Sequence, residues 1–557
     1  MHQLILKQRN PSQSSWLPRS ANNRGLAWAR THCSSTAQSQ QRSADTVTTR
    51  DMAVLLPVLL CLGALLLALL YWVGAFRRRR PGEPPFDRGW LPWLGHVLSF
   101  RRDTAEFLRR MQGKHGDIFT VQLAGDYVTF LMEPHSFGAV VKESRAKLDF
   151  EKFATELVAR VFGYHAREND HQLLEALSHK YLMGDGLEEL TQAMTLNLQN
   201  LMLEGLPEGE WMEDGLFHFC YNMVFRAGYL SLFGNEQGPG GDKGAGRLVD
   251  RQHSETLFTE FRRYDRLFPR LAYAVLLPGQ KVEAERLKRY FWETLSVDKM
   301  RHRENISGWV SERQRQMEEQ GLEKGMRNRY MLLLLWASQG NTGPSAFWLL
   351  LHLARHPEAL QAVRAEADNM LRESGQEAGP GKPPVRLTRR MLQQCPVLDS
   401  AVEESMRLAA APVLIRAVLQ DMALRLHDGR EYRLRRGDRL ALFPHLSLQM
   451  DPEIYPEPTE FRYDRFLQPS GLRKTDFYKG GRRLKYFTMP WGAGVSICPG
   501  RFFAVNELKQ FIFLMLIYFD FELLQPEDAV PPIDRSRWGF GVMQPCHEVR
   551  FRYRQRS

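Results

Sequence analysis

One stretch of the chain constrains its folding more than any other. Residues 53–76, AVLLPVLLCLGALLLALLYWVGAF, carry no charged side chain over 24 positions. As a helix this stretch would be about 36 Å long, enough to cross a bilayer. The apolar core of a cleaved signal peptide is shorter, about 7–15 residues. The sequence therefore predicts a single transmembrane signal anchor at 53–76, in preference to a buried core helix.

The charges on either side of this stretch differ. Arg77 to Arg80 follow it directly, and Arg88 makes five arginines in the next twenty residues, whereas only Arg42 and Arg50 lie in the twenty before it. Because positive flanks stay in the cytosol, the C-terminal bulk is predicted to be cytosolic. Residues 77–88, which include PGEPP, are expected to form a basic, proline-rich hinge before a catalytic domain at 89–557.

Residues 1–51 have a different composition from the rest. They are rich in Ser, Gln, Asn and Thr and show no hydrophobic periodicity, which is typical of a disordered extension. The same composition resembles a transit peptide. A third interpretation, which we favour, is that Met52 is the working start and that 1–51 are absent from the mature protein.

The composition of the chain restricts the classes of partner that it could bind. The net charge of +11 favours anionic partners, but no block of basic and aromatic residues resembles a nucleic-acid surface. We expect no nucleic acid, and rather an acidic membrane face or an acidic redox partner. The six cysteines have no CxxC pair, which indicates a reducing compartment and no disulfide framework.

Beyond residue 86 the pattern predicts a mainly α fold with small β-sheets near both ends. Residues 117–134 alternate around Ala-Gly-Asp and indicate a hairpin, and residues 424–443 alternate again. Residues 330–371 are too apolar for a surface helix, so their first part should cross the core. Gly340, Asn341, Gly343 and Pro344 are poor helix formers and predict a distortion in that helix.

Three separated motifs suggest a common site. Glu404 and Arg407 are three residues apart and share a helix face, and Arg465 lies in a proline-rich stretch further on. An exposed ion pair would contribute little. A carboxylate between two guanidinium groups would instead form a buried, multiply hydrogen-bonded lock.

A lone cysteine, Cys498, follows a glycine-rich turn in MPWGAGVSICPGRFF. Taken alone, such a thiol is most often an inert apolar residue. Here Trp491, Gly494 and Gly500 surround it, and Pro499 suits the first turn of a following helix. A helix N-terminus favours a thiolate, so Cys498 is the candidate metal ligand.

In order and spacing, Glu404–Arg407, Arg465–Phe466 and the Cys498 loop resemble the cytochrome P450 haem-thiolate family, from about Met52 to the C-terminus. The resemblance implies the cytochrome P450 fold, with haem b iron ligated by Cys498 and with Trp491, Gly494 and Gly500 around it. It also implies that Arg416 binds a haem propionate, because Ser496 replaces the arginine that usually does so.

Three stretches, residues 335–348, 489–503 and 537–545, resemble more narrowly the sterol 12α-hydroxylase branch of that family. This implies a monooxygenase of the endoplasmic reticulum that hydroxylates 7α-hydroxycholest-4-en-3-one in bile acid synthesis. NADPH electrons would arrive through NADPH-cytochrome P450 reductase. The neighbouring prostacyclin synthase branch, an isomerase of a prostaglandin endoperoxide, is the alternative. A non-catalytic haem-binding protein is disfavoured.

The resemblance also identifies the residues expected on the distal side of the haem, where dioxygen is bound. Gly340 and Asn341 stand where most of these oxygenases carry an acid–threonine pair, with Thr342 adjacent, and both branches tolerate asparagine there. Sterol contacts are expected at Trp336, Ala337, Phe540, Val542 and Met543. A membrane-dipping surface is predicted within residues 267–277, including Phe268 and Leu271.

Overall fold

A computed structural model describes residues 55, 57–71, 77–167, 170–207, 209–238 and 242–556. The chain falls into two compact units, residues 1–72 and 73–557. In the first, residues 57–71 are helical. In the described part of the chain, no helix is both long and apolar enough to cross a membrane. The predicted extension 1–51 and the two ends of the predicted anchor, 53–54 and 72–76, lie outside the described residues.

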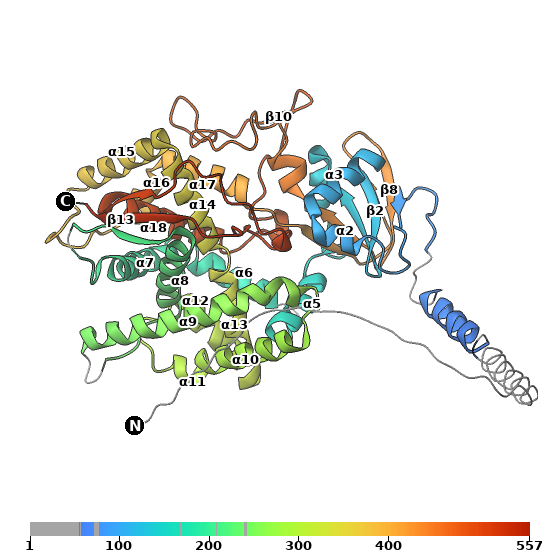
Figure 1. The fold of residues 1–557 in the computed structure, drawn as a ribbon, viewed down its shortest axis with the longest axis horizontal. Coiled ribbons are helices and arrows are strands. Elements are labelled where there is room, and N and C mark those ends of the chain that lie inside the picture. Colours follow the sequence, from blue (N-terminus) through green and yellow to red (C-terminus); the bar gives the residue numbers. More distant parts are fainter. Residues whose placement is uncertain are drawn as a thin grey trace, which may run out of the picture. The chain divides into compact units, whose positions relative to one another are not determined.

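The second unit is mainly helical with small sheets, which confirms the predicted fold class. Figure 1 shows strands β2 and β8 beside helices α2 and α3, with α7, α8 and α9 packed together elsewhere in the unit. Its helices are α2 (Val97–Arg102), α3 (Thr104–His115), α4 (Phe137–Val141), α5 (Glu151–Phe162), α6 (Asp170–Tyr181), α7 (Gly186–Leu203), α8 (Leu216–Phe233), α9 (Lys243–Ala272), α10 (Pro278–Thr294), α11 (Val297–Met300), α12 (Gly308–Glu319), α13 (Lys324–Gln339), α14 (Thr342–Arg355), α15 (Pro357–Glu373), α16 (Arg389–Gln393), α17 (Pro396–Ala409) and α18 (Arg501–Tyr518).

The strands of the described residues form four sheets. The largest has the order β1-β2-β3-β9-β6-β4, and the three-stranded sheet has the order β12-β13-β5. The other two are the hairpins β7-β8 and β10-β11. The strands are β1 (Phe86–Asp87), β2 (Ile118–Leu123), β3 (Asp126–Leu131), β4 (Leu148–Asp149), β5 (Met212–Gly215), β6 (Leu414–Val418), β7 (Met422–Arg425), β8 (Glu431–Leu434), β9 (Arg439–Leu442), β10 (Tyr478–Lys479), β11 (Arg482–Arg483), β12 (Phe519–Leu523) and β13 (Arg550–Gln555).

The predicted hairpin at 117–134 is strands β2 and β3. Its two turn residues, Ala124 and Gly125, both have positive φ, 50° and 88°. That geometry matches the twist of a two-residue hairpin, and glycine adopts it without strain. The second alternating stretch, residues 424–443, supplies the end of β7, then β8 and β9, so both predictions are confirmed.

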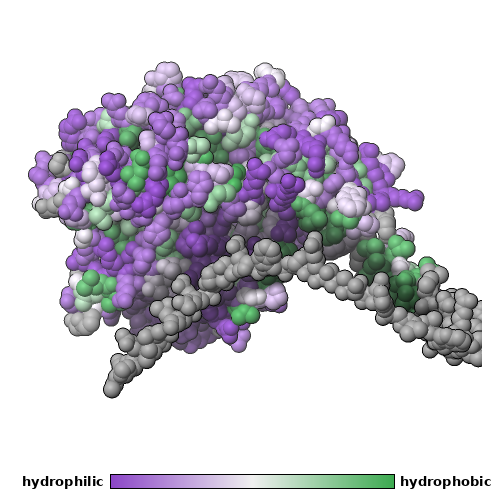
Figure 2. All heavy atoms as spheres, viewed as in Figure 1, coloured by the Kyte–Doolittle hydropathy of each residue, from purple (hydrophilic) through white to green (hydrophobic). Residues whose placement is uncertain are grey.

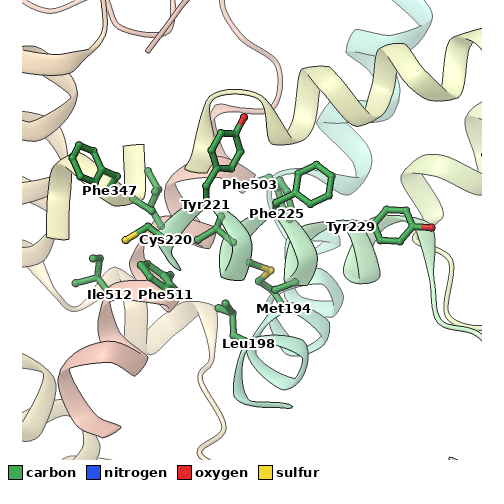
Figure 3. Close-up of a cluster of buried hydrophobic side chains, with 14 of the residues drawn as sticks. Met194, Leu198, Cys220, Tyr221, Phe225, Tyr229, Phe347, Phe503, Phe511 and Ile512 are labelled. Carbon is green, nitrogen blue, oxygen red and sulfur yellow. The ribbon is translucent and has the colours of Figure 1, made fainter. Parts of the chain in front are cut away.

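Helix α8 is the centre of the helical core. Nearly all of its residues are buried, so it is apolar on every side, as a helix surrounded by other helices must be. Figure 3 shows Cys220, Tyr221 and Phe225 of α8 among Met194 of α7 and Phe511 of α18. Polar residues cover most of the visible surface of this unit (Figure 2).

The core helix is broken at the predicted place. Helix α13 ends at Gln339 and α14 begins at Thr342. At Gly343 a Cβ atom would lie only 2.0 Å from the Tyr221 ring, so a side chain there would push α8 away. The Tyr221 hydroxyl donates to the carbonyl of Gly340 at 3.1 Å, which satisfies an acceptor that the break exposes. The predicted distortion is confirmed.

The predicted hinge, residues 77–88, lies within the second unit and packs against it. Arg77 pairs with Asp438 at 2.5 Å, and Glu83 pairs with Arg435. Strand β1 then runs parallel to β2. These contacts fix the start of the folded unit against its largest sheet.

Candidate active site

The loop that carries Cys498 is held close to its neighbours by backbone contacts. The Cys498 amide donates to the Trp491 carbonyl at 2.8 Å, which closes the loop. Gly494 has φ +65°, and a Cβ there would lie 2.5 Å from the Val141 carbonyl oxygen. Only glycine combines this conformation with this approach. The loop is therefore pressed onto helix α4.

The Cys498 thiol has the environment of a metal ligand. Burial raises its pKa, while the backbone N–H groups of Gly500 and Arg501 and the positive charge of Arg501 lower it in part. N–H groups directed at sulfur stabilise a thiolate. The predicted helix start was wrong by two residues, because Gly500 is the cap and α18 begins at Arg501. Pro499 therefore precedes the helix and does not occupy its first turn.

Arg416 lies on strand β6 beside this loop. A Cβ at Gly492 would contact the Leu414 side chain at 3.7 Å, which places β6 next to the Cys498 loop. Arg416 is buried, and its hydrogen bond goes to the adjacent Ile415 carbonyl at 2.8 Å. Burial lowers its pKa, with the Asp149 carboxylate offsetting part of the effect. It makes no ion pair with a carboxylate within the described ranges, so this buried cation suits an anionic group.

These observations test whether the residues fit the haem that the resemblance implies. They do fit: a thiol with two N–H groups beside it, a loop that approaches its neighbours closely at Gly494, and a buried cation that forms no ion pair within the described residues. Cys498 would hold the iron, and Arg416 would face a propionate.

Glu404, Arg407 and Arg465 form a buried ion-pair network. Arg407 binds both Glu404 carboxylate oxygens, at 2.7 and 2.8 Å, and Arg465 Nε binds Glu404 Oε1 at 2.8 Å. Glu404 and Arg407 are fully buried. Remaining N–H groups of the two guanidinium ions donate to backbone carbonyls, among them those of Gln449 and Pro456. The network thereby ties α17 to the irregular segment before the Cys498 loop.

The end of α13 has an open face. Ala337 is exposed there and Trp336 is partly exposed, whereas the middle of the helix, residues 330–335, is mostly buried. Asn341, in the break that follows α13, is also partly exposed. The Trp336 ring stacks on Phe268 at 4.2 Å, and its Nε1 is buried without an acceptor in the described part of the chain.

The C-terminal loop, residues 539–543, is fixed by backbone hydrogen bonds to residues 409–413. The Ala411 amide donates to the Gly541 carbonyl at 2.9 Å, and the Met543 amide donates to the Ala409 carbonyl at 2.9 Å. Phe540 is partly exposed and meets Phe268 edge to face at 5.3 Å. The loop therefore completes an aromatic cluster with Trp336.

The predicted sterol contacts divide into two groups. Trp336 and Phe540 share the aromatic cluster around Phe268, and Ala337 follows on the open face of α13. Val542 is nearly buried, and Met543 packs in a different core cluster with Trp538, its carbonyl accepting from Trp348 Nε1 at 2.7 Å. The structure therefore places the Met543 side chain in the core.

The three distal residues differ in their contacts. Asn341 Oδ1 accepts from the Val542 amide at 2.9 Å, which joins the helix break to the C-terminal loop. Gly340 is buried, and a Cβ there would lie 2.8 Å from the Trp336 carbonyl. The Thr342 hydroxyl donates to the Ser338 carbonyl at 3.2 Å, so it belongs to the helix and not to the open face.

A buried acid behind the break was missed from the sequence. Glu507 on α18 is fully buried, and burial raises the pKa of its carboxyl well above the usual range, with the Thr342 hydroxyl lowering it only in part. A Cβ at Gly228 would lie 2.4 Å from Glu507 Oε1, so α8 needs glycine there. An acidic residue inside an otherwise apolar segment, residues 501–518, is the signal that could have found it.

The predicted membrane surface needs a correction. Phe268 and Leu271 are buried, at 1% and 4% exposure, because the face of α9 that carries them packs into the helical core. Within the predicted range 267–277, the exposed large apolar residues are Val275 and Leu277, just beyond the end of α9.

Comparison with known proteins identifies relatives over nearly the whole chain. The cytochrome P450 family model matches residues 84–551. A pig 5β-cholestane-3α,7α-diol 12α-hydroxylase is 51% identical over 504 residues, 89% of this chain and 98% of its own length. The human 7α-hydroxycholest-4-en-3-one 12α-hydroxylase is 50% identical over 88% of this chain and 98% of its own length.

Two further matches extend the comparison. Human prostacyclin synthase is 47% identical over 86% of this chain and 95% of its own length. A solved structure of a cyanobacterial cytochrome P450 bound to retinoic acid covers 86% of this chain and all of its own, with a TM-score of 0.63 and 20% identity. That similarity concerns the fold.

Proposed function

This chain belongs to the cytochrome P450 family, and from that premise we propose that it is a monooxygenase that hydroxylates 7α-hydroxycholest-4-en-3-one at the 12α position. The observation that carries the proposal is the 50–51% identity to 12α-hydroxylases over almost their whole length. The aromatic cluster of Trp336, Phe268 and Phe540 supports it, because fused apolar rings pack well against aromatic faces.

Each candidate site residue has a separate role in the proposed reaction. When bound, haem would supply the activation of dioxygen, and the Cys498 sulfur would hold its iron. Arg416 would offset the charge of a propionate. The partly exposed Trp336 ring would exclude water and orient the sterol. The Asn341 amide, fixed by Val542, presents a hydrogen-bond donor where an acid–alcohol pair is usual.

The proposal also includes the location of the protein in the cell and the source of its electrons. Residues 53–76 would anchor the protein in the endoplasmic reticulum membrane, with the catalytic unit in the cytosol. NADPH electrons would arrive through NADPH-cytochrome P450 reductase. The uncharged stretch and the arginines at 77–80 support the anchor and its orientation.

The deciding experiment combines the full chain with reductase, dioxygen and 7α-hydroxycholest-4-en-3-one. We expect NADPH loss with a product heavier by one oxygen atom, and nuclear magnetic resonance to place the hydroxyl at carbon 12. Absence of product from protein that shows the thiolate-type carbon monoxide spectrum would overturn the proposal.

A second candidate has its own support. The 47% identity to human prostacyclin synthase favours isomerisation of a prostaglandin endoperoxide. Such a reaction needs neither NADPH nor dioxygen, because the substrate already contains the O–O bond. Turnover of an endoperoxide without NADPH, alongside no sterol product, would decide for the isomerase.

A further inference from the structure

A basic cleft borders the aromatic cluster of the candidate active site, since Tyr273 lines the cleft and packs against Phe540 at 5.3 Å. Its volume is about 430 Å³, and it lies between the end of α2, the last turns of α9, the start of α10 and residues 535–538. Arg101, Arg266, Arg270 and Arg535 line it, and no Asp or Glu does. Four guanidinium groups around one cleft create a strongly positive site.

Three of these arginines are not neutralised. Arg101, Arg266 and Arg270 make no ion pair with a carboxylate within the described ranges; Arg101 lies over the Tyr273 ring at 5.3 Å. Arg535 alone has an acidic partner, Asp103 at 3.0 Å. The nearby buried acid Asp265 is already bound by Arg262 and Arg537. The cleft therefore keeps an unbalanced positive charge.

Exposed apolar side chains lie within three residues of the cleft-lining residues in sequence. Leu98, one turn before Arg101 on α2, is 63% exposed. Val275 and Leu277, in the segment between Tyr273 and α10, are 39% and 63% exposed. Large apolar side chains beside unpaired cations match an amphiphile that carries an anionic head and apolar tails.

We infer that this cleft binds the headgroup of an acidic phospholipid at the membrane surface. The phosphate and any carboxylate of the headgroup would lie among Arg101, Arg266 and Arg270, with the acyl chains along Leu98 and Leu277. The volume favours a lipid headgroup over inorganic phosphate, because 430 Å³ falls in the range of sites for organic ligands. This inference is independent of the reaction, and it holds for a hydroxylase or an isomerase.

The test uses the full chain in a nonionic detergent and titration calorimetry with three probes: dihexanoyl phosphatidylserine, dihexanoyl phosphatidylcholine and inorganic phosphate. We expect one phosphatidylserine to bind per chain, more tightly than either other probe. The triple variant Arg101→Gln, Arg266→Gln, Arg270→Gln should weaken that binding at least about tenfold, since it removes the charge-assisted hydrogen bonds.

A matched control removes the same charge elsewhere. Arg390, Arg425 and Arg482 are also exposed and form no ion pair in the described part of the chain. Their triple change to Gln should leave binding within about twofold. The carbon monoxide spectrum of each variant verifies folding.

Several results would overturn the inference. These are equal weakening by both triple variants, wild-type binding by the cleft variant, or phosphatidylcholine binding as tight as phosphatidylserine. Phosphate binding as tightly as phosphatidylserine would identify a free-anion site and overturn the lipid assignment.

Discussion

The Asn341 side-chain oxygen accepts a hydrogen bond from the Val542 amide at 2.9 Å, across 201 positions of sequence. The bond joins the break between α13 and α14 to the C-terminal loop. It also fixes the orientation of the amide, because the oxygen is engaged by the Val542 amide and the NH₂ group is left as the donor.

The first prediction concerns that donor. Asn341→Asp keeps an oxygen for the Val542 amide but removes the NH₂ group, so product formed per NADPH consumed should fall about threefold to tenfold. The measurement is the ratio of sterol product to NADPH loss. Asn341→Leu removes both interactions, so the ratio of product to NADPH consumed should fall further. A ratio unchanged in Asn341→Asp would exclude a role for the donor.

The second prediction concerns the buried lock. Glu404→Gln leaves Arg407 and Arg465 buried without a counter-charge, so the free energy of unfolding should fall by about 3–5 kcal/mol. Its neighbour is a matched control: Glu403 pairs with the exposed Arg473, and Glu403→Gln should cost less than about 1 kcal/mol. Denaturant midpoints and haem content measure both. Similar losses in the two variants would contradict a special role for the lock.

The third prediction concerns Glu507 and pH. In the unfolded chain this carboxyl ionises near its ordinary pKa of 4.5, whereas burial keeps it protonated in the folded protein well above that value. The folded state therefore holds one more proton above pH 4.5, and its stability falls as the pH rises, by up to about 1.4 kcal/mol per pH unit.

Glu507→Gln removes this dependence because glutamine does not titrate. The variant should gain stability relative to the wild type between pH 5.5 and pH 7.5, and the gain should grow with pH. Urea midpoints at the two values measure it. The same difference at both pH values would show that Glu507 does not carry the extra proton.

The fourth prediction concerns the Cys498 loop. Gly494→Ala places a Cβ 2.5 Å from the Val141 carbonyl in a left-handed conformation, so the loop must move. Gly480 shares a positive φ, +56°, but has open space around it. The yield of the thiolate-type carbon monoxide spectrum should fall steeply in Gly494→Ala and little in Gly480→Ala. Equal yields would indicate that backbone strain alone matters at these sites.

Local patterns predicted much of this protein. The alternation at 117–134 and the positive-φ pair Ala124–Gly125 specify a hairpin within a few residues of chain. The glycines and proline at 340–344 specify a helix break because they disfavour helix wherever they stand. The start of α18 was misplaced, since Pro499 permits a first turn there but contacts across the loop decide where the helix begins.

Other features depend on distant partners. The sequence made Phe268 and Leu271 candidates for a membrane surface, but the packing of α9 buries both, Phe268 against Trp336. The sequence around Glu507 does not indicate that its side chain packs against Gly228 on another helix, where the absence of a side chain leaves space for the carboxyl group. The sequence likewise does not indicate that Asn341 bonds to the Val542 amide.

The sequence by itself determined the family, the fold class, the cysteine proposed as the metal ligand and the members of the lock, because each depends on residue types at fixed spacings. Only the tertiary structure decided which side chains of α13 are exposed, which amide orients Asn341, and where four arginines from three segments converge on one cleft. Those properties arise from packing between segments hundreds of residues apart, and burial and distance, which set their energies, are not encoded in any one stretch.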